Sequence, residues 1–180
     1  MAPARMVDDG DVQLSEMTAD EVAAWLPGST ARYIEDRVAA GEDRATAARV
    51  AESQRALTFP GGVPAAGHRL MHVLADGVAV GVVWVGPPAP GSAGTMFLYQ
   101  IEIDELHRGR GHGRAAMVAT ERFARALGAN RLMLSVFGFN TVARSLYDSL
   151  GFVEASAHLE KPLGSAVEPD EVHDVPLASP

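Results

Sequence analysis

A turn rich in glycine and arginine, residues 108–114, has the composition expected of an anion-binding site. Its residues are Arg108, Gly109, Arg110, Gly111, His112, Gly113 and Arg114. Glycines let the backbone turn sharply and approach a ligand closely, with N–H groups left free to bind it. Such amides, together with the positive end of a following helix, attract negative charge, and the arginines add to that attraction. The turn therefore predicts a phosphate site, and a pyrophosphate fits it better still.

Other glycine-rich phosphate loops match this turn less well. A Walker loop requires Gly-Lys-Ser/Thr, and the turn has neither a lysine nor a hydroxyl. A dinucleotide-binding fingerprint fits only in its looser form, from Gly111 through Gly113 to Ala116. It would also need an acidic residue at the end of the next strand, and residues 133–137 contain none. A tight turn with solvated arginines is the remaining alternative.

The elements that position this turn follow from the hydrophobic periodicity. We expect strands at 12–16, 69–74, 78–85, 96–104, 131–137 and from 152 onward, with 158–163 closing the sheet. Helices are expected from 18 to 41 with an interruption at Pro27-Gly28, at 43–57, from the turn to 127, and at 140–150. The dipeptide Asp76-Gly77 predicts a hairpin between the second and third strands. The pattern predicts an α/β fold, a mixed sheet with helices on it.

Composition and charge restrict the class of protein. The 180 residues suit a single domain, expected at 12–163, between a flexible N-terminus (1–11) and a flexible acidic, proline-containing tail (164–180). The net charge of −8 disfavours nucleic acid as a partner, and the absence of cysteine excludes a thiol nucleophile. The six histidines show no metal-ligand spacing with acids, so no metal is expected. With neither a membrane-length apolar run nor a leader segment, we expect a cytoplasmic protein that binds no membrane.

Two segments together resemble the GNAT superfamily of N-acetyltransferases. Arg108, Gly111 and Gly113 match the family's acetyl-CoA loop, Arg/Gln-x-x-Gly-x-Gly/Ala, and the strand 97–104 before them resembles the family's central strand. Residues 140–152 resemble its second segment, Asn-x-x-Ala-x-x-x-Tyr-x-x-x-Gly-Phe. The resemblance is strong over residues 96–163 and extends more weakly back to residue 69. It implies a GNAT-like fold, a central twisted mixed sheet flanked by helices.

The resemblance implies how acetyl-CoA would bind. The central strand would splay away from its neighbour, and the pantetheine arm would pair with the backbone of Ile101 and Ile103. The amide of Ile101 would face the thioester carbonyl, where negative charge develops during attack. The whole turn 108–114 would hold the pyrophosphate. Asn140 would open the next helix as its N-cap or reach the pantetheine arm.

The resemblance also suggests the groups that move protons. Tyr147 matches the family's usual general acid, although a buried tyrosine that only packs is the alternative. Glu102, the acid inside the strongest strand, is the candidate base, because burial there would make it more basic; it could instead pair with an arginine such as Arg131. His72 could relay a proton or be a satisfied core residue. Some aminoglycoside-modifying members have an acid where this chain has Gln100. This difference argues against an aminoglycoside as the acceptor.

The predicted function is transfer of an acetyl group from acetyl-CoA to a primary amine of a small molecule or peptide. The alternatives are an acyl-CoA-binding sensor or interaction module without turnover, and a protein N-terminal or lysine acetyltransferase. The residues that choose the acceptor are expected in 18–68 and 86–95. Because sheet edges in such folds often pair between subunits, a homodimer is also predicted.

Overall fold

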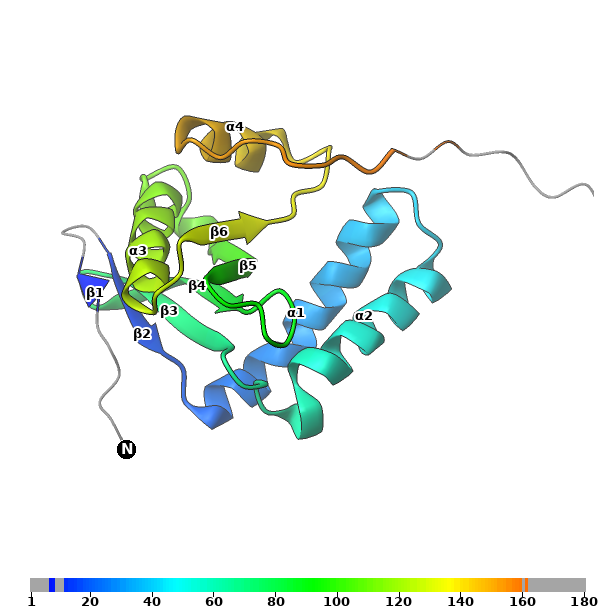
Figure 1. Ribbon diagram of the computed structural model, residues 1–180, viewed down its shortest axis with the longest axis horizontal. Coiled ribbons are helices and arrows are strands. Elements are labelled where there is room, and N and C mark those ends of the chain that lie inside the picture. The colour runs from blue at the N-terminus through cyan, green and yellow to red at the C-terminus, as the bar shows by residue number, and fades with distance from the viewer. Residues whose placement is uncertain (1–6, 9–11, 160, 162–180) are drawn as a thin grey trace, which may run out of the picture.

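A single six-stranded sheet organises the computed structural model, which describes residues 7–8, 12–159 and 161 (Figure 1). The strands lie in sequence order: β1 (Val7–Asp8), β2 (Gln13–Glu16), β3 (Arg69–Ala75), β4 (Val78–Gly86), β5 (Thr95–Ile103) and β6 (Arg131–Leu134). Every neighbouring pair is antiparallel except β5 and β6, which are parallel. The hairpin predicted at Asp76-Gly77 is confirmed, and both residues have positive φ. The sheet is therefore mixed, as the α/β pattern predicts.

Helices cover both faces of the sheet (Figure 1). On one face lie α1 (Ala19–Ala39) and α2 (Arg44–Thr58), followed by the 3₁₀ turn η1 (Pro60–Gly62). On the other lie α3 (His112–Ala126), which the turn η2 (Glu105–His107) precedes, and α4 (Thr141–Ser149). The larger core lies between the sheet and α3, where Met117 and Phe123 are buried, and a smaller one lies beneath α1. The two faces thus have separate cores.

Helix α1 is continuous through Pro27, so the predicted interruption at Pro27-Gly28 is wrong. It begins with a capping box in which Thr18 and Glu21 each bond the other's backbone N–H. A proline inside a helix costs about 3 kcal/mol relative to alanine. Val22 and Leu26 before the proline and Ser29 after it are all buried. Packing of both halves against the rest of the protein offsets that cost.

Strand β5 carries a bulge that separates it from β6. Trp84 pairs with Gln100 and the next β4 residue, Val85, pairs with Leu98, so Tyr99 is an extra residue. Strand β6 pairs with β5 only from Thr95 to Leu98, and beyond that point β5 keeps its partner on the β4 side alone. A bulge bends and twists its strand, which accounts for this divergence. The splayed central strand implied by the resemblance is therefore present.

Other predicted element boundaries differ from the structure. Strand β6 ends at Leu134 instead of 137, because β5 has already diverged and offers no further partner. No strand forms between Phe152 and Leu159; Phe152 packs on Tyr147 of α4, and Val153 and Leu159 are exposed. The predicted strand from 152 is thus wrong for the described residues. Of the ends expected to be flexible, Val7–Asp8 pair with β2, while the remainder of 1–11 and all of 164–180 lie outside the described residues.

Close approach of β4 and β5 leaves no space for a larger side chain at Gly81. A Cβ built there would lie 2.1 Å from the carbonyl oxygen of Glu102, whereas a Cβ at Gly28 in α1 would meet nothing within 4 Å. We expect Gly81→Ala to lower the free energy of unfolding by about 1–3 kcal/mol through overpacking. Gly28→Ala should raise it by about 0.5–1 kcal/mol, because alanine favours the helix. Urea denaturation of both variants measures this difference, and an unchanged stability of Gly81→Ala would contradict the close contact.

Candidate functional site

The open edge of β5 presents unpaired backbone groups. Asp104 donates its N–H to the carbonyl of Val80, 2.9 Å away on the β4 side. Because backbone groups alternate along a strand, the N–H and C=O groups of Ile101 and Ile103 turn to the opposite side, where β6 has diverged. The carbonyl of Ile103 accepts from Nε of Arg108 at 2.8 Å, whereas no strand pairs with Ile101 there. An extended ligand bearing amides could add to this edge.

The N-terminus of α3 lies at the end of β5. Its N-cap is Gly111, which has φ +87° and no side chain, so no side chain caps the first-turn amides. The conformation favours glycine, and Gly109 has a similar φ of +74°. A Cβ on Gly113 would lie 3.9 Å from Ile103 and 3.7 Å from Leu146. The structure therefore brings together the end of β5, the glycine- and arginine-rich turn at 108–114 and helix α4.

Three arginines belong to this turn. Besides bonding Ile103, Arg108 lies 3.6 Å from Glu105, and Arg114 donates to the hydroxyl of Ser149 in α4. Arg110 is exposed, as are the other two. Two of the predicted ligand-binding arginines are thus held in place by neighbouring elements. The turn combines free helix amides with positive charge, which suits a phosphate or pyrophosphate group.

Helix α4 positions the other two residues that the second matching segment singled out. Asn140 is its N-cap and accepts from the amide of Ala143 at 3.1 Å, which leaves the side-chain NH₂ group for other partners. Tyr147 is half-buried, packs on Phe152 with ring centroids 5.7 Å apart, and contacts the large core. Burial raises the pKa of the Tyr147 phenol above its usual range. Its hydroxyl is therefore protonated at neutral pH and can donate a proton or a hydrogen bond.

Beyond the bulge, the even-numbered side chains of β5 face α1 instead of α3. Ser29 of α1 donates to Oε1 of Gln100 at 2.6 Å, and Nε2 of Gln100 donates to Glu102 at 3.1 Å. Glu102 also forms an ion pair with Arg32 of α1, not with Arg131. The sequence suggested Arg131 only as an example of a partner; it lies on β6, which has separated from β5 at this point. The Arg32 guanidinium therefore lies beside the Glu102 carboxylate.

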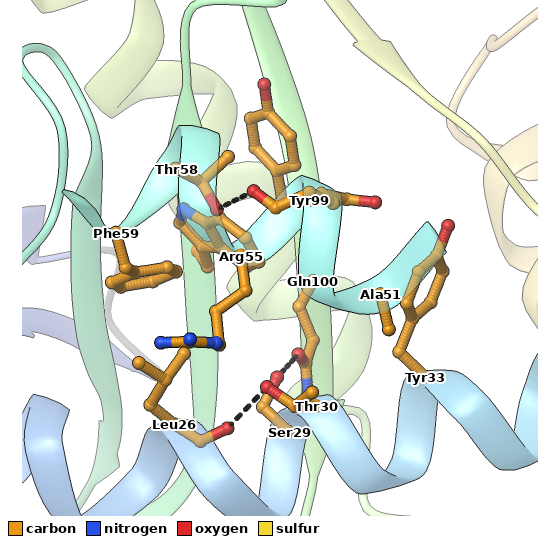
Figure 2. A pocket seen from close by; sticks show the side chains of 12 residues that line it. Leu26, Ser29, Thr30, Tyr33, Ala51, Arg55, Thr58, Phe59, Tyr99 and Gln100 are labelled. Carbon is orange, nitrogen blue, oxygen red and sulfur yellow. Dashed lines mark hydrogen bonds between the residues drawn. The ribbon is translucent and has the colours of Figure 1, made fainter. Parts of the chain in front are cut away.

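A cleft lies on this face, between α1, α2 and the sheet (Figure 2). Its lining residues are Leu26, Ser29, Thr30, Tyr33, Ala51, Gln54, Arg55, Thr58, Phe59, Trp84, Tyr99 and Gln100. Trp84 and Tyr99 stack with their ring centroids 4.5 Å apart, and Phe59 lies 5.0 Å from Trp84. Apart from Gln100, sequence reasoning named none of these as site residues, because they match no motif. The only signal was the expectation that 18–68 contains acceptor-selecting residues.

Two histidines on this face are engaged in structural contacts. Nε2 of His72 lies 3.2 Å from a carboxylate oxygen of Glu21. This contact favours a structural role for His72 over a role in proton transfer. His68 is buried, and its Nδ1 accepts from the indole N–H of Trp84 at 3.0 Å. Burial, followed by the charge of Arg69, lowers the pKa of His68. A neutral His68 thus holds one of the aromatic rings that line the cleft.

Comparison with known proteins identifies the family. The sequence profile of the acetyltransferase (GNAT) family matches residues 34–152. The chain belongs to the GNAT family. This GNAT protein is 29% identical over 154 residues to an uncharacterised N-acetyltransferase, YycN, of Bacillus subtilis (strain 168), covering 84% of this chain and 99% of YycN. It is an acetyl-CoA-dependent acyltransferase, as its family and its relatives indicate.

Solved structures agree with this family. The crystal structure of YycN superposes with a TM-score of 0.75, covering 84% of this chain and 98% of that one. The aminoglycoside N-acetyltransferase AAC(6')-Iy in complex with CoA gives a TM-score of 0.52 at 18% identity, over 87% of this chain and 97% of that one, so it shares the fold. A mycothiol acetyltransferase of Beutenbergia cavernae is 34% identical over 91 residues, 51% of this chain and 30% of that protein. The GNAT fold of this chain is thereby shown.

Among the described residues, no helix has both the length and the apolar character needed to cross a membrane.

The lowered pKa of His68 makes stability depend on pH. An unfolded histidine binds a proton near its ordinary pKa of 6.5, and the folded one binds it at lower pH, so protonation favours unfolding. This stability is fully present above about pH 6.5 and is lost as the pH falls below it. We expect the melting temperature of the wild type to fall more between about pH 7.5 and 5.5 than that of His68→Gln, which can still accept from Trp84. Parallel pH dependences in a thermal unfolding series would contradict a neutral, buried His68.

Proposed function

We propose that this acyltransferase moves an acetyl group from acetyl-CoA to a primary amine of a small molecule. The observation that supports it best is the arrangement around β5. Its open edge and the amides of α3 lie on one side; on the other, Gln100 lines the cleft and donates a hydrogen bond to Glu102. A thioester held at the edge would meet an amine held in the cleft. Both substrates would then reach the same strand from opposite directions.

The turn at the start of α3 and the edge of β5 are proposed to bind acetyl-CoA. The amides and side chains of residues 108–114 would hold the pyrophosphate by hydrogen bonds and charge. The backbone of Ile101 and Ile103 would pair with the amides of the pantetheine arm, which requires Arg108 to release the Ile103 carbonyl. The free NH₂ group of Asn140 could reach the same arm. These roles use groups that the fold leaves without a strand or capping partner.

The proposed reaction is direct attack of the amine nitrogen on the thioester carbonyl. A C–N bond forms, the C–S bond breaks, and the amine proton must leave while the thiolate gains one. Attack makes the nitrogen strongly acidic, so the ionised Glu102 would take its proton, directly or through water. Tyr147, kept protonated by burial, would donate to the departing thiolate. The N–H of Ile101 would stabilise the negative charge on the carbonyl oxygen.

The cleft favours a small acceptor over a protein chain. Helices α1 and α2 bound it, and its lining combines apolar and aromatic side chains with a few polar groups, as small-molecule sites do. A sensor without turnover needs neither an ionised carboxylate nor a protonated phenol beside the bound thioester. Release of thiol with any amine would exclude that alternative.

The homodimer and the cytoplasmic location stay predictions; β6 has an edge without a strand partner within the described part of the chain.

The anion-binding turn is tested by a pair of glycine variants. Gly111 and Gly128 lie at opposite ends of α3, with φ of +87° and +86° and open space around each. Glutamate therefore adds similar backbone strain at both positions, but only at Gly111 does it place a negative charge at the expected pyrophosphate site. We expect Gly111→Glu to abolish acetyl-CoA binding in calorimetric titration and Gly128→Glu to retain it, with both variants folded. Retained affinity in Gly111→Glu would refute the role of the turn.

The role of Tyr147 is tested by removing only its hydroxyl. Tyr147→Phe keeps the ring that packs on Phe152, so the fold should persist. If the phenol protonates the thiolate, we expect turnover to fall by about 10²–10⁴-fold while acetyl-CoA affinity changes little. Steady-state kinetics and titration of the same sample separate the two effects. Equal losses in turnover and affinity would instead support a packing role.

A further inference from the structure

Two threonine hydroxyls of the cleft are oriented to receive hydrogen bonds (Figure 2). Thr30 donates to the carbonyl of Leu26 at 2.9 Å, and Thr58 donates to the carbonyl of Gln54 at 2.8 Å. A hydroxyl has one proton, so each of these oxygens has only lone pairs left for a ligand. Both side chains line the cleft. They fit a ligand that donates hydrogen bonds.

Ser29 is oriented in the same way through a chain of contacts. The ionised Glu102 accepts from Nε2 of Gln100, which turns the amide oxygen Oε1 toward Ser29. Ser29 must then donate to that oxygen, and its own lone pairs are left free. An amine N–H bound at Ser29 would lie beside the side chain that holds Glu102. The nitrogen end of the acceptor is therefore placed at Ser29 and Gln100.

Apolar and aromatic side chains make up much of the remaining lining, and it holds little charge. Leu26, Phe59 and Trp84 line it, and the indole N–H of Trp84 is used by His68. The lining residues include no carboxylate, and the one ionised side chain among them, Arg55, pairs with Glu52 at 2.6 Å. A second positive charge on the ligand would lose its hydration without gaining an anionic partner, and Arg55 would repel it.

We propose that the acceptor is a primary monoamine with an uncharged aromatic or branched apolar body, and not a polycation such as a polyamine or an aminoglycoside. This inference rests on the proposed function and specifies its acceptor. The amine binds at Ser29 and Gln100, and the body lies against Phe59 and Trp84. The net charge of −8 on the whole chain does not oppose this, because the cleft itself contains no acid among its lining residues.

An amine panel tests this substrate class. With purified protein and acetyl-CoA, thiol release is measured for phenethylamine, isopentylamine, spermidine and kanamycin. We expect kcat/KM for the two monoamines to exceed that for either polycation by at least about tenfold, a difference of ~1.4 kcal/mol. Thiol release with a polycation as the preferred acceptor would overturn the substrate class and leave the proposed function intact.

A matched pair of variants tests the electrostatic reason. Thr30 is half-buried at the cleft, so aspartate adds a charge there and asparagine a neutral group of the same size. We expect Thr30→Asp to raise the ratio of spermidine to phenethylamine activity by about tenfold relative to Thr30→Asn. Equal ratios in the two variants would overturn the charge argument. Unfolding curves establish that both variants are folded.

Calorimetric titration with phenethylamine and with spermidine separates the two proposals. Tighter binding of phenethylamine without turnover of any amine would refute the proposed function and support the ligand class of the cleft. Binding of spermidine as tight as that of phenethylamine would overturn the ligand class, whether or not turnover occurs. The wild-type protein gives this answer even if the variants at Thr30 fail to fold.

Discussion

The bulge at Tyr99 is the feature on which the site depends. One extra residue in β5 ends its pairing with β6 after Leu98 and exposes a strand edge in the middle of the sheet. It also changes which side chains face which helix layer. Met96 and Leu98 before the bulge and Ile101 and Ile103 after it all pack toward α3, although they differ in parity. Gln100 and Glu102 are thereby turned to the opposite face.

The consequence is a strand with two distinct chemical faces. Toward α3, the strand presents apolar side chains and an open backbone edge. The N-terminus of α3, which has no side-chain cap, lies at the end of this strand. Toward α1 it offers the amide of Gln100 and the carboxylate of Glu102, fixed by Ser29 and Arg32. A buried aromatic cluster around Trp84 packs beneath the second face, and a neutral His68 accepts a hydrogen bond from the Trp84 indole. The separation suits a reaction in which two substrates meet across one strand.

Helix α1 connects the fold to the chemistry. Its first half packs Val22 and Leu26 over the sheet, and its second half brings Ser29 and Arg32 to β5. Both halves must belong to one helix for these contacts to exist together, so the continuity through Pro27 is part of the site. A break there, which the Pro-Gly pair predicts locally, would separate the packing residues from the polar ones.

Local signals in the sequence determined the glycine-rich turn at 108–114, the hairpin at Asp76-Gly77, the helix that Asn140 caps, and the order of the elements as far as that helix. Glycine conformations, caps and periodicity depend on neighbours within a few residues, so a single sequence shows them. Tertiary structure alone decided that Arg32 is the partner of Glu102, that β6 stops at Leu134, and that residues 152–159 form no strand. It also assembled the cleft from α1, α2, β4 and β5. Those outcomes depend on which distant segments bury surface together, and the free energy of such packing is not encoded in any local pattern.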